Sequence, residues 1–297
     1  MDSNITPIFI ISMPRSGSTL LQKIIMTSPD VSSVSEPWIN LPLSDIFEPK
    51  TKAWYNKTVA LRGLSGLEST LAMHSLDIHT ALGYCVNSLY TRVAHKGAKY
   101  FIDKTPRYYG IVPFLKKAFP TAKFIYLLRS PAEVLSSKIQ KNDNRLPPLK
   151  YALMDTITAT RKLVEAKSMD TSSLCLKFAD LTDNTAETIF RLEEHLSITL
   201  DVSKLGAVEL RGDFGDVRAR NSSAIERSKQ SDWTRSVSTL CRYLVFSHML
   251  NKVPSAFYDL MGTSRLDHFE MLKVVHKRLA HKPRVGMVEL LRSVARS

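Results

Sequence analysis

The sequence predicts an α/β fold in which a parallel sheet is flanked by helices. Three observations support this class: short apolar runs alternate with stretches of helical periodicity, two of the runs lead directly into a helix-start signal, and 44% of the 297 residues are hydrophobic. An apolar share of this size is enough for one large core. We therefore expect one main domain over residues 1–263, followed by a basic, amphipathic helical extension over residues 264–297.

The first predicted strand is the apolar run Ile8–Ile11, which ends before Pro14. An uninterrupted apolar run bounded by turn residues is typical of a strand that is buried on both faces of a sheet. A helix follows directly, with apolar residues that share one face: Leu20, Leu21, Ile24 and Ile25. The first unit is therefore strand, short polar loop, helix.

The same pattern returns near residue 125. Lys123–Leu128 is a predicted strand, and the tetrapeptide that begins at Ser130 predicts a helix start, with Ser130 as the cap, Pro131 in the first turn and Glu133 completing a capping box. Two further apolar runs add candidate strands: Tyr100–Ile102 and Leu174–Phe178.

Two other regions have helical character. Residues 40–98 contain no strand pattern, and we interpret them as a helical insertion over the active edge of the sheet. The C-terminal stretch 265–297 holds eight basic and three acidic residues with periodic apolar positions. A helix of this kind either rests on an anionic membrane or packs on the core as part of a C-terminal helix pair.

The charge balance limits the function classes. Forty-one basic and 28 acidic residues give a net charge of +13, which favours polyanionic partners such as nucleic acid, acidic lipid or a phosphorylated cosubstrate. No pattern typical of a nucleic-acid-binding domain is present, so we expect no nucleic acid partner. The three cysteines are widely spaced and indicate neither a disulfide framework nor a zinc site. No N-terminal signal or membrane-spanning run is present, and we expect a cytoplasmic protein.

Residues 14–19, Pro-Arg-Ser-Gly-Ser-Thr, lie between a predicted buried strand and a helix start. Phosphate is the expected ligand, because the first N–H groups of a helix have no intrahelical partner and the helix dipole favours negative charge. Gly17 lets the backbone turn closely around the anion, Arg15 offers a forked cation, and hydroxyl donors come from Ser16, Ser18 and Thr19. A kinase or nucleotide triphosphatase would need G-x-x-x-x-G-K-[ST] here. The lysine is absent, so the loop is P-loop-like and suited to a phosphate that needs no magnesium.

This loop resembles the 5′-phosphosulfate loop, usually P-R-S-G-T-T, of sulfotransferases that use 3′-phosphoadenosine 5′-phosphosulfate (PAPS). A second motif agrees: residues 129–137, Arg-Ser-Pro-Ala-Glu-Val-Leu-Ser-Ser, resemble the 3′-phosphate motif R-x-P-x-x-x-x-x-S of that family. The resemblance implies that Arg129 and Ser137 hold the 3′-phosphate. Residues 103–106 and 178–181 resemble further family segments, and the match runs from about Ile8 to Trp233.

The resemblance also implies an activity and a set of catalytic residues. A sulfuryl group would pass from PAPS to an acceptor hydroxyl, with Arg15 and Lys104 stabilising the charge on the leaving oxygen. Glu36 is the candidate base, as in the branch of the family that includes protein-tyrosine and many bacterial sulfotransferases; alternatively, it caps a turn before Pro37. Another branch uses histidine, for which weaker candidates are His74, His79 and His95. Ser228 resembles a serine that stabilises the leaving phosphate in tyrosylprotein sulfotransferases.

The acceptor is expected to be a carbohydrate or a glycolipid, and a small phenol or a peptide tyrosine is the alternative. Aromatic residues that could stack on such an acceptor are Trp38, Trp54 and Tyr108. No metal is expected to take part, because the histidines and cysteines have no ligand spacing. The basic extension suggests peripheral contact with the inner face of the membrane.

Overall fold

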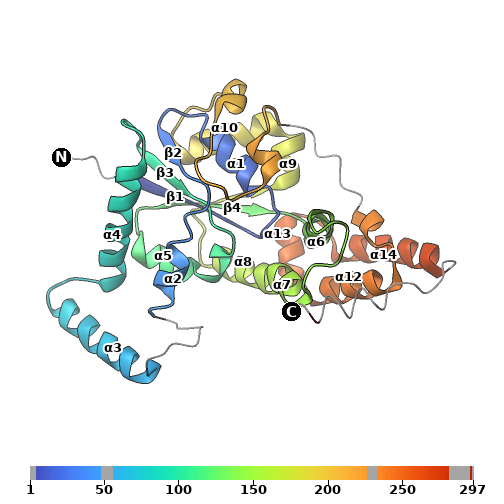
Figure 1. Ribbon diagram of the computed structural model, residues 1–297, viewed down its shortest axis with the longest axis horizontal. Coiled ribbons are helices and arrows are strands. Elements are labelled where there is room, and N and C mark those ends of the chain that lie inside the picture. The colour runs from blue at the N-terminus through green and yellow to red at the C-terminus, as the bar shows by residue number, and fades with distance from the viewer. Residues whose placement is uncertain (1–4, 48–55, 226–232, 281–294, 296–297) are drawn as a thin grey trace.

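The computed structural model describes residues 5–47, 56–225, 233–280 and 295, and it confirms the α/β class. Within these residues, five parallel strands form one sheet in the order β2-β3-β1-β4-β5 (Figure 1). The strands are β1 (Thr6–Ser12), β2 (Val31–Ser33), β3 (Tyr100–Asp103), β4 (Lys123–Leu128) and β5 (Leu174–Lys177). Four of them coincide with the predicted apolar runs. The short edge strand β2 was not predicted.

The central strand β1 is buried on both faces, as its continuous apolar run predicts. It pairs with β3 from Thr6 opposite Tyr100, and with β4 from Ile8 opposite Lys123. Its side chains alternate between two hydrophobic clusters: Ile8 and Ile10 belong to one, and Phe9 and Ile11 to the other. Each face of the sheet therefore needs its own cover of helices.

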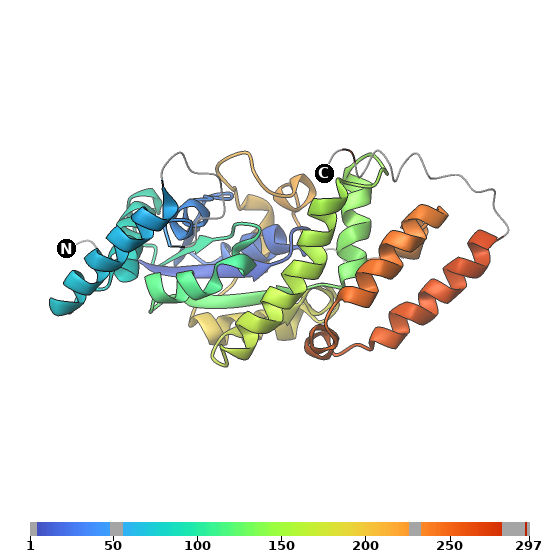
Figure 2. The same cartoon turned by 90° about the horizontal axis from the view of Figure 1, so that it is seen from below.

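Figures 1 and 2 show helices on both faces of the sheet. Ile8 and Ile10 pack in the cluster of α1 (Ser18–Ile25), α9 (Phe178–Asp183) and α10 (Thr185–Leu196). The opposite cluster includes α4 (Ile78–Val93), α5 (Val112–Ala118), α6 (Pro131–Lys141) and α8 (Ala159–Ser168). Shorter elements connect these: α2 (Asn40–Ser44), the 3-10 turns Tyr108–Gly110, Val202–Ala207 and Trp233–Ser236, α7 (Leu149–Leu153), the π-helix Met154–Thr158 and α11 (Val217–Arg220).

The start of α6 differs in one detail from the prediction. The helix begins at Pro131, but the capping box does not form. Ser130 Oγ lies 3.1 Å from His268 Nε2, and Glu133 Oε2 accepts a hydrogen bond from Arg129 Nε at 2.9 Å. The charged guanidinium is a stronger partner for this carboxylate than a backbone amide would be.

The insertion is helical, as predicted, but its two long helices do not lie over the active edge of the sheet. Its described helices are α2, α3 (Lys57–Met73) and α4, and α2 does reach this edge, where Asn40 Nδ2 donates to Asp103 Oδ2 at the end of β3 at 3.0 Å. Asn87 Nδ2 in α4 donates to the carbonyl of Ile5 at 2.9 Å, and the backbone of Gly83 lies against Ala118 of α5. α4 therefore packs beside the start of β1, and α3 extends away from the sheet (Figures 1 and 2).

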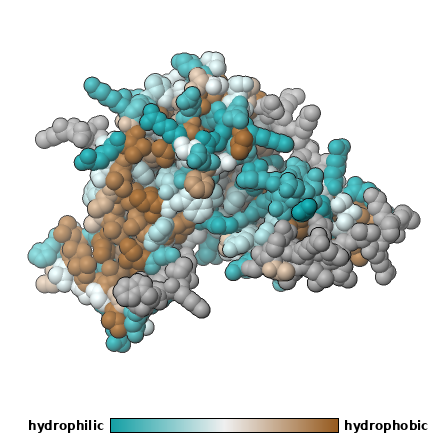
Figure 3. Space-filling model, in the orientation of Figure 1, coloured by the Kyte–Doolittle hydropathy of each residue, from teal (hydrophilic) through white to brown (hydrophobic). Residues whose placement is uncertain are grey.

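The insertion carries an apolar surface, which we call the α3–α4 surface. Figure 3 shows apolar residues gathered over these two helices. None of the residues of α3, all of which the structure describes, is buried. The exposed apolar side chains are Val59, Leu61, Leu67, Met73, Leu76, Tyr84, Leu89 and Val93. An apolar surface of this extent is typical of a contact surface rather than of a solvated helix.

The chain ends its described part in three helices, α12 (Leu240–Lys252), α13 (Ser255–Met261) and α14 (Arg265–Ala280). Leu272 and Val275 of α14 are buried, so residues 265–280 of the predicted extension pack on the core. Most of the remaining extension, residues 281–294, lies outside the described residues. None of the helices in the described ranges combines the length and the apolar composition that a bilayer span requires.

Candidate active site

The predicted site residues come from neighbouring strands of the sheet. β3, β1 and β4 are adjacent and parallel, so their carboxyl ends lie along one edge. The phosphate loop, residues 13–17, follows β1, and Lys104 and Arg129 follow β3 and β4 directly. Ligands of open α/β sheets bind at this edge.

The phosphate loop has an unusual backbone. Arg15 and Gly17 have φ angles of 71° and 90°, in the left-handed region. A Cβ atom at Gly17 would lie 2.3 Å from the ring of Phe178, so both the conformation and the space require glycine. The start of α1 has no side-chain cap, and the buried Ser16 hydroxyl has no hydrogen-bond partner among the described residues. The loop thus retains free donors for an anion.

Arg15 joins the two predicted phosphate motifs. Its Nε donates to Ser137 Oγ at 3.2 Å, and its carbonyl accepts a hydrogen bond from Arg129 Nη1 at 3.0 Å. Its Nη1 also forms an ion pair with Asp216 Oδ2 at 2.6 Å. The two motifs, which are far apart in sequence, are in direct contact.

Arg129 lies between the phosphate loop and a separate cavity. Its guanidinium lies over the ring of Phe178, with the Cζ atom 4.4 Å from the ring centroid. Arg129 lines a cavity of about 490 Å³ whose wall includes four aromatic side chains: Phe178, Trp233, Tyr258 and His268. The stacking and the ion pair with Glu133 hold the guanidinium plane in a fixed orientation.

Glu36 and Lys104 form a buried ion pair. Lys104 Nζ lies 2.8 Å from Glu36 Oε1, and the two side chains are 2% and 9% exposed. The same ammonium donates to Thr19 Oγ1 at 3.3 Å, and Trp38 Nε1 donates to Glu36 Oε2 at 3.2 Å. Burial lowers the pKa of Lys104 below its ordinary value of 10.5, although Glu36 opposes this. The ion pair therefore places one acidic group, Glu36, and one basic group, Lys104, beside the phosphate loop.

The carboxylate of Asp103 fixes the turn that carries Lys104. It accepts four hydrogen bonds, at 2.6 to 3.0 Å, from Tyr90, Tyr108, Asn40 and Thr105. Burial raises the pKa of Asp103 despite these donors. Tyr108 is completely buried in this network, so the expectation that it stacks on an acceptor is wrong.

A cavity of about 410 Å³, the Glu36 cavity, lies in front of the phosphate loop. It is lined by the loop, Glu36, Pro106 and Lys141, and on the other side by residues 213–217 and 219. We call residues 211–217 the acidic loop. This loop was not predicted from the sequence, although Gly212 and Gly215, which adopt φ angles of 95° and 112°, are a turn signal.

Asp155, which is buried in the π-helix, was also not predicted from the sequence. It accepts hydrogen bonds from Arg107 Nε at 3.0 Å, from Tyr109 at 3.1 Å, and from Lys138, the residue after Ser137. Burial lowers the pKa of Lys138, and Asp155 opposes this. Burial raises the pKa of Asp155, but the hydrogen bonds from Arg107 and Lys138 outweigh it and leave the pKa lowered. Asp155 thus holds two cations beside the phosphate motif, a role that no local pattern indicates.

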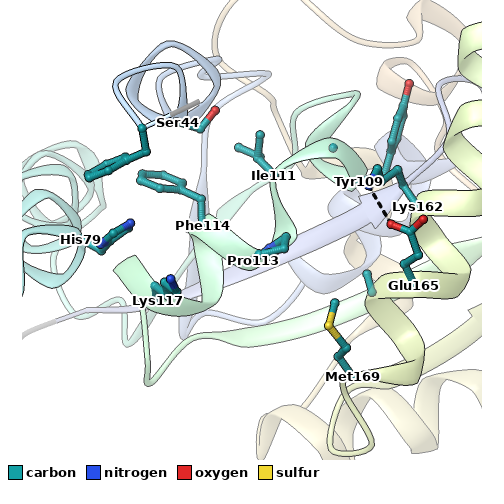
Figure 4. A pocket seen from close by; sticks show the side chains of 13 residues that line it. Ser44, His79, Tyr109, Ile111, Pro113, Phe114, Lys117, Lys162, Glu165 and Met169 are labelled. Carbon is teal, nitrogen blue, oxygen red and sulfur yellow. Dashed lines mark hydrogen bonds and ion pairs between the residues drawn. The ribbon is translucent and has the colours of Figure 1, made fainter. Parts of the chain in front are cut away.

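The three histidines named as weaker bases lie elsewhere. His79 stacks on Phe47 with ring centroids 4.0 Å apart, in a separate cavity of about 180 Å³. Figure 4 shows His79 and Phe114 on one side of this cavity and Glu165 and Met169 on the other. His74 is exposed at the end of α3, and His95 Nε2 lies 2.9 Å from the carbonyl oxygen of Pro29. None of these described histidines lines the Glu36 cavity.

Two predicted residues, Ser228 and Trp54, lie outside the described residues. Within the described ranges, no group of three or more His, Cys, Asp or Glu side chains could hold a metal ion. The absence of a metal from the reaction stays a prediction.

Comparisons with known proteins show the family to which the chain belongs. A family model described as "Sulfotransferase family" matches residues 7–202. The nodulation protein NoeE of Sinorhizobium fredii (strain NBRC 101917 / NGR234) is 26% identical over 191 residues, covering 61% of this chain and 42% of NoeE. An uncharacterized protein of Aquifex aeolicus (strain VF5) is 30% identical over 141 residues, covering 46% of this chain and 17% of that protein. The chain thus spans less than half the length of these relatives.

A solved structure adds a match at the level of the fold. The sulfotransferase domain of the Synechococcus PCC 7002 olefin synthase aligns with a TM-score of 0.54 and 16% identity, over 92% of this chain and 96% of that domain. Since the family model covers more than half of the residues, the chain belongs to the sulfotransferase family.

Proposed function

We propose that the protein transfers a sulfuryl group from PAPS to an acceptor hydroxyl. The observation that carries the proposal is the contact between the two phosphate motifs: Arg15 donates to Ser137 and accepts from Arg129. A nucleotide with phosphates at both ends of its ribose needs two anion sites at one sheet edge. The uncapped start of α1 and the free, buried Ser16 hydroxyl of the described chain fit such a ligand.

Each site residue has a task in this reaction. Arg15, Ser16, Ser18, Thr19 and the loop amides around Gly17 would bind the 5′-phosphosulfate, and Arg129 and Ser137 would bind the 3′-phosphate. A bond forms between the acceptor oxygen and sulfur, and the bond from sulfur to the bridging oxygen breaks. That oxygen keeps the electron pair and becomes part of 3′-phosphoadenosine 5′-phosphate (PAP). Lys104 would stabilise its charge, and Glu36 would accept the proton of the acceptor hydroxyl.

The chemistry of the Glu36 cavity supports a carbohydrate or glycolipid acceptor. Glu36, Asp213 and Asp216 contribute three carboxylates, and Phe214, which is 60% exposed, contributes an aromatic face. Carboxylates accept hydrogen bonds from sugar hydroxyls and repel anionic acceptors, while the ring offers a stacking surface. A small phenol or a peptide tyrosine would use the ring but has few groups for the carboxylates.

We also propose a cytoplasmic protein with peripheral membrane contact. The basic extension, most of which lies outside the described residues, and the exposed α3–α4 surface both support this contact. Binding to vesicles that contain phosphatidylserine should decrease when residues 281–297 are removed. Equal binding by the shortened chain would exclude the extension as the contact.

The test of the activity has two parts. PAP should raise the melting temperature and Mg-ATP should not, which separates this proposal from a P-loop kinase. Labelled PAPS should then give a labelled product with members of a panel of glycans, glycolipids, phenols and tyrosine peptides. Absence of PAP binding, or stabilisation by Mg-ATP, would contradict the proposal. Labelling of phenols or peptides alone would overturn the carbohydrate part.

A further inference from the structure

The acidic loop is firmly attached to the elements around the phosphate loop. Lys23 of α1, which is 1% exposed, donates through Nζ to the carbonyls of Arg220 and Ser222, both at 2.8 Å. Arg220 in turn donates to the carbonyls of Leu210 at 2.9 Å and Phe214 at 2.8 Å. These contacts, from a buried ammonium and a forked guanidinium, hold the residues on both sides of the loop and the carbonyl of Phe214 within it.

The end of this loop contacts the two groups that would bind the 5′ anion. Asp216 Oδ2 lies 2.6 Å from Arg15 Nη1, and the backbone N–H of Asp216 donates to Thr19 Oγ1 at 3.3 Å. Gly215, with a φ angle of 112°, comes close to Thr19, where a Cβ atom would lie 3.4 Å from its Oγ1. The carboxylate of Asp216 therefore has the position and charge of an anionic ligand of Arg15.

We propose that Asp216 is a positioning residue that competes with the 5′ anion of the nucleotide for Arg15. The proposal rests on the proposed function, because it assumes that Arg15 binds the nucleotide. Without nucleotide, Asp216 holds the guanidinium at the edge of the Glu36 cavity. When the nucleotide binds, its 5′ anion replaces the carboxylate, and Asp216 becomes free to face the acceptor beside Glu36. The acceptor site is then complete only after the nucleotide has bound.

The solvent exposure of the Arg15–Asp216 ion pair sets how much PAP affinity should change when the pair is removed. The side chains of Arg15 and Asp216 are 21% and 28% exposed, so solvent screens part of their attraction. Exchange of one partly exposed ion pair corresponds to a change of about threefold to fivefold in an equilibrium constant. Removing the carboxylate should therefore tighten PAP binding by about this factor, with most of the change in the dissociation rate.

Calorimetric titration with PAP tests the proposal. Asp216→Asn keeps the shape of the side chain and removes its charge. Asp213→Asn removes the same charge from the same loop, and Asp213 makes no ion pair with Arg15 in the described structure, so it is the matched control for PAP affinity. Arg15→Gln alone and combined with Asp216→Asn completes a double-mutant cycle.

We expect Asp216→Asn to lower the Kd of PAP by threefold to fivefold, Asp213→Asn to leave it within twofold, and Asp216→Asn to have no effect when Arg15 is glutamine. Equal tightening by both aspartate variants would show a general charge effect and overturn the proposal. So would an unchanged or a higher Kd in Asp216→Asn. Failure of the wild-type protein to bind PAP would instead contradict the proposed function.

Discussion

The substitution Glu36→Gln is the sharpest test of the site. Glu36 pairs with Lys104 at 2.8 Å, and both side chains are almost completely buried. Removing one member of a fully buried pair costs about 3–5 kcal/mol, because the other charge is left without a partner. Glutamine keeps the volume, and its carbonyl still accepts from Lys104. We therefore expect the free energy of unfolding to decrease by about 2–3 kcal/mol, which is less than the cost of removing the partner altogether.

The effect on the reaction should be larger than the effect on stability. Without a carboxylate to accept the proton of the acceptor, kcat should decrease by about 10²–10⁴-fold. PAP affinity should stay within about threefold of wild type or increase, because the substitution removes a negative charge near the anion site and no phosphate ligand. Glu36→Asp, which keeps the charge, should retain part of the activity.

Three measurements separate these effects: the urea midpoint of unfolding, the Kd of PAP, and single-turnover transfer from labelled PAPS. A folded Glu36→Gln variant whose turnover lies within tenfold of wild type would refute the assignment of the base. A variant that loses PAP binding along with turnover would show that Glu36 supports the nucleotide site instead.

The other predictions concern Lys104, Asp155, Arg129 and the need for a metal ion. Because the pKa of Lys104 is lowered, kcat/KM for PAPS should decline with rising pH below the ordinary lysine value of 10.5, and Lys104→Arg should move this limb to higher pH in a pH–rate profile. Asp155→Asn should reduce stability by about 2–4 kcal/mol in urea unfolding, since it leaves the buried charge of Lys138 unpaired. The lowered pKa of Asp155 stabilises the fold above its ordinary value of 3.8, so the difference from wild type should disappear as pH falls through its folded pKa. Arg129→Ala should weaken PAP binding by about tenfold to a hundredfold, whereas Arg191→Ala, whose guanidinium donates to the carbonyl of Cys175, should not. EDTA should leave turnover unchanged, and a loss restored by Mg²⁺ would contradict the prediction of a metal-free reaction.

The sequence predicted the strands that carry an apolar run. β1 and β4 have uninterrupted apolar runs because both of their faces are covered by helices. β2 was missed because Val31 is its only apolar residue. Ser32 and Ser33 are buried through contacts that no local pattern reports, such as the hydrogen bond from Ser33 Oγ to the carbonyl of Ile102 at 2.7 Å.

The residues of the candidate site differ in the same way: some follow predicted strands, and others are placed by contacts between distant segments. Arg15, Lys104 and Arg129 follow predicted strands directly, so the parallel topology alone brings them to one edge. Asp216 and Asp155 reach the site through packing between distant segments; the Asp216 amide and Thr19 are 197 residues apart. Such contacts depend on the path of loops and on a π-helix, which local periodicity does not predict. The placement of α3 and α4 was wrong for a related reason, because periodicity indicates a helix but not the end of the sheet on which it packs.

The phosphate loop bears on the proposal that the reaction needs no metal ion. In the pattern G-x-x-x-x-G-K-[ST], the lysine binds phosphates and the final hydroxyl binds magnesium. With Gly17 as the second glycine, Ser18 takes the lysine position and Thr19 the magnesium-binding position. Here the Thr19 hydroxyl accepts from the ammonium of Lys104 at 3.3 Å. The cation beside the hydroxyl therefore comes from the neighbouring strand. Because Glu36 holds this ammonium at 2.8 Å, the proposed reaction would find a fixed cation for the charge on the leaving oxygen.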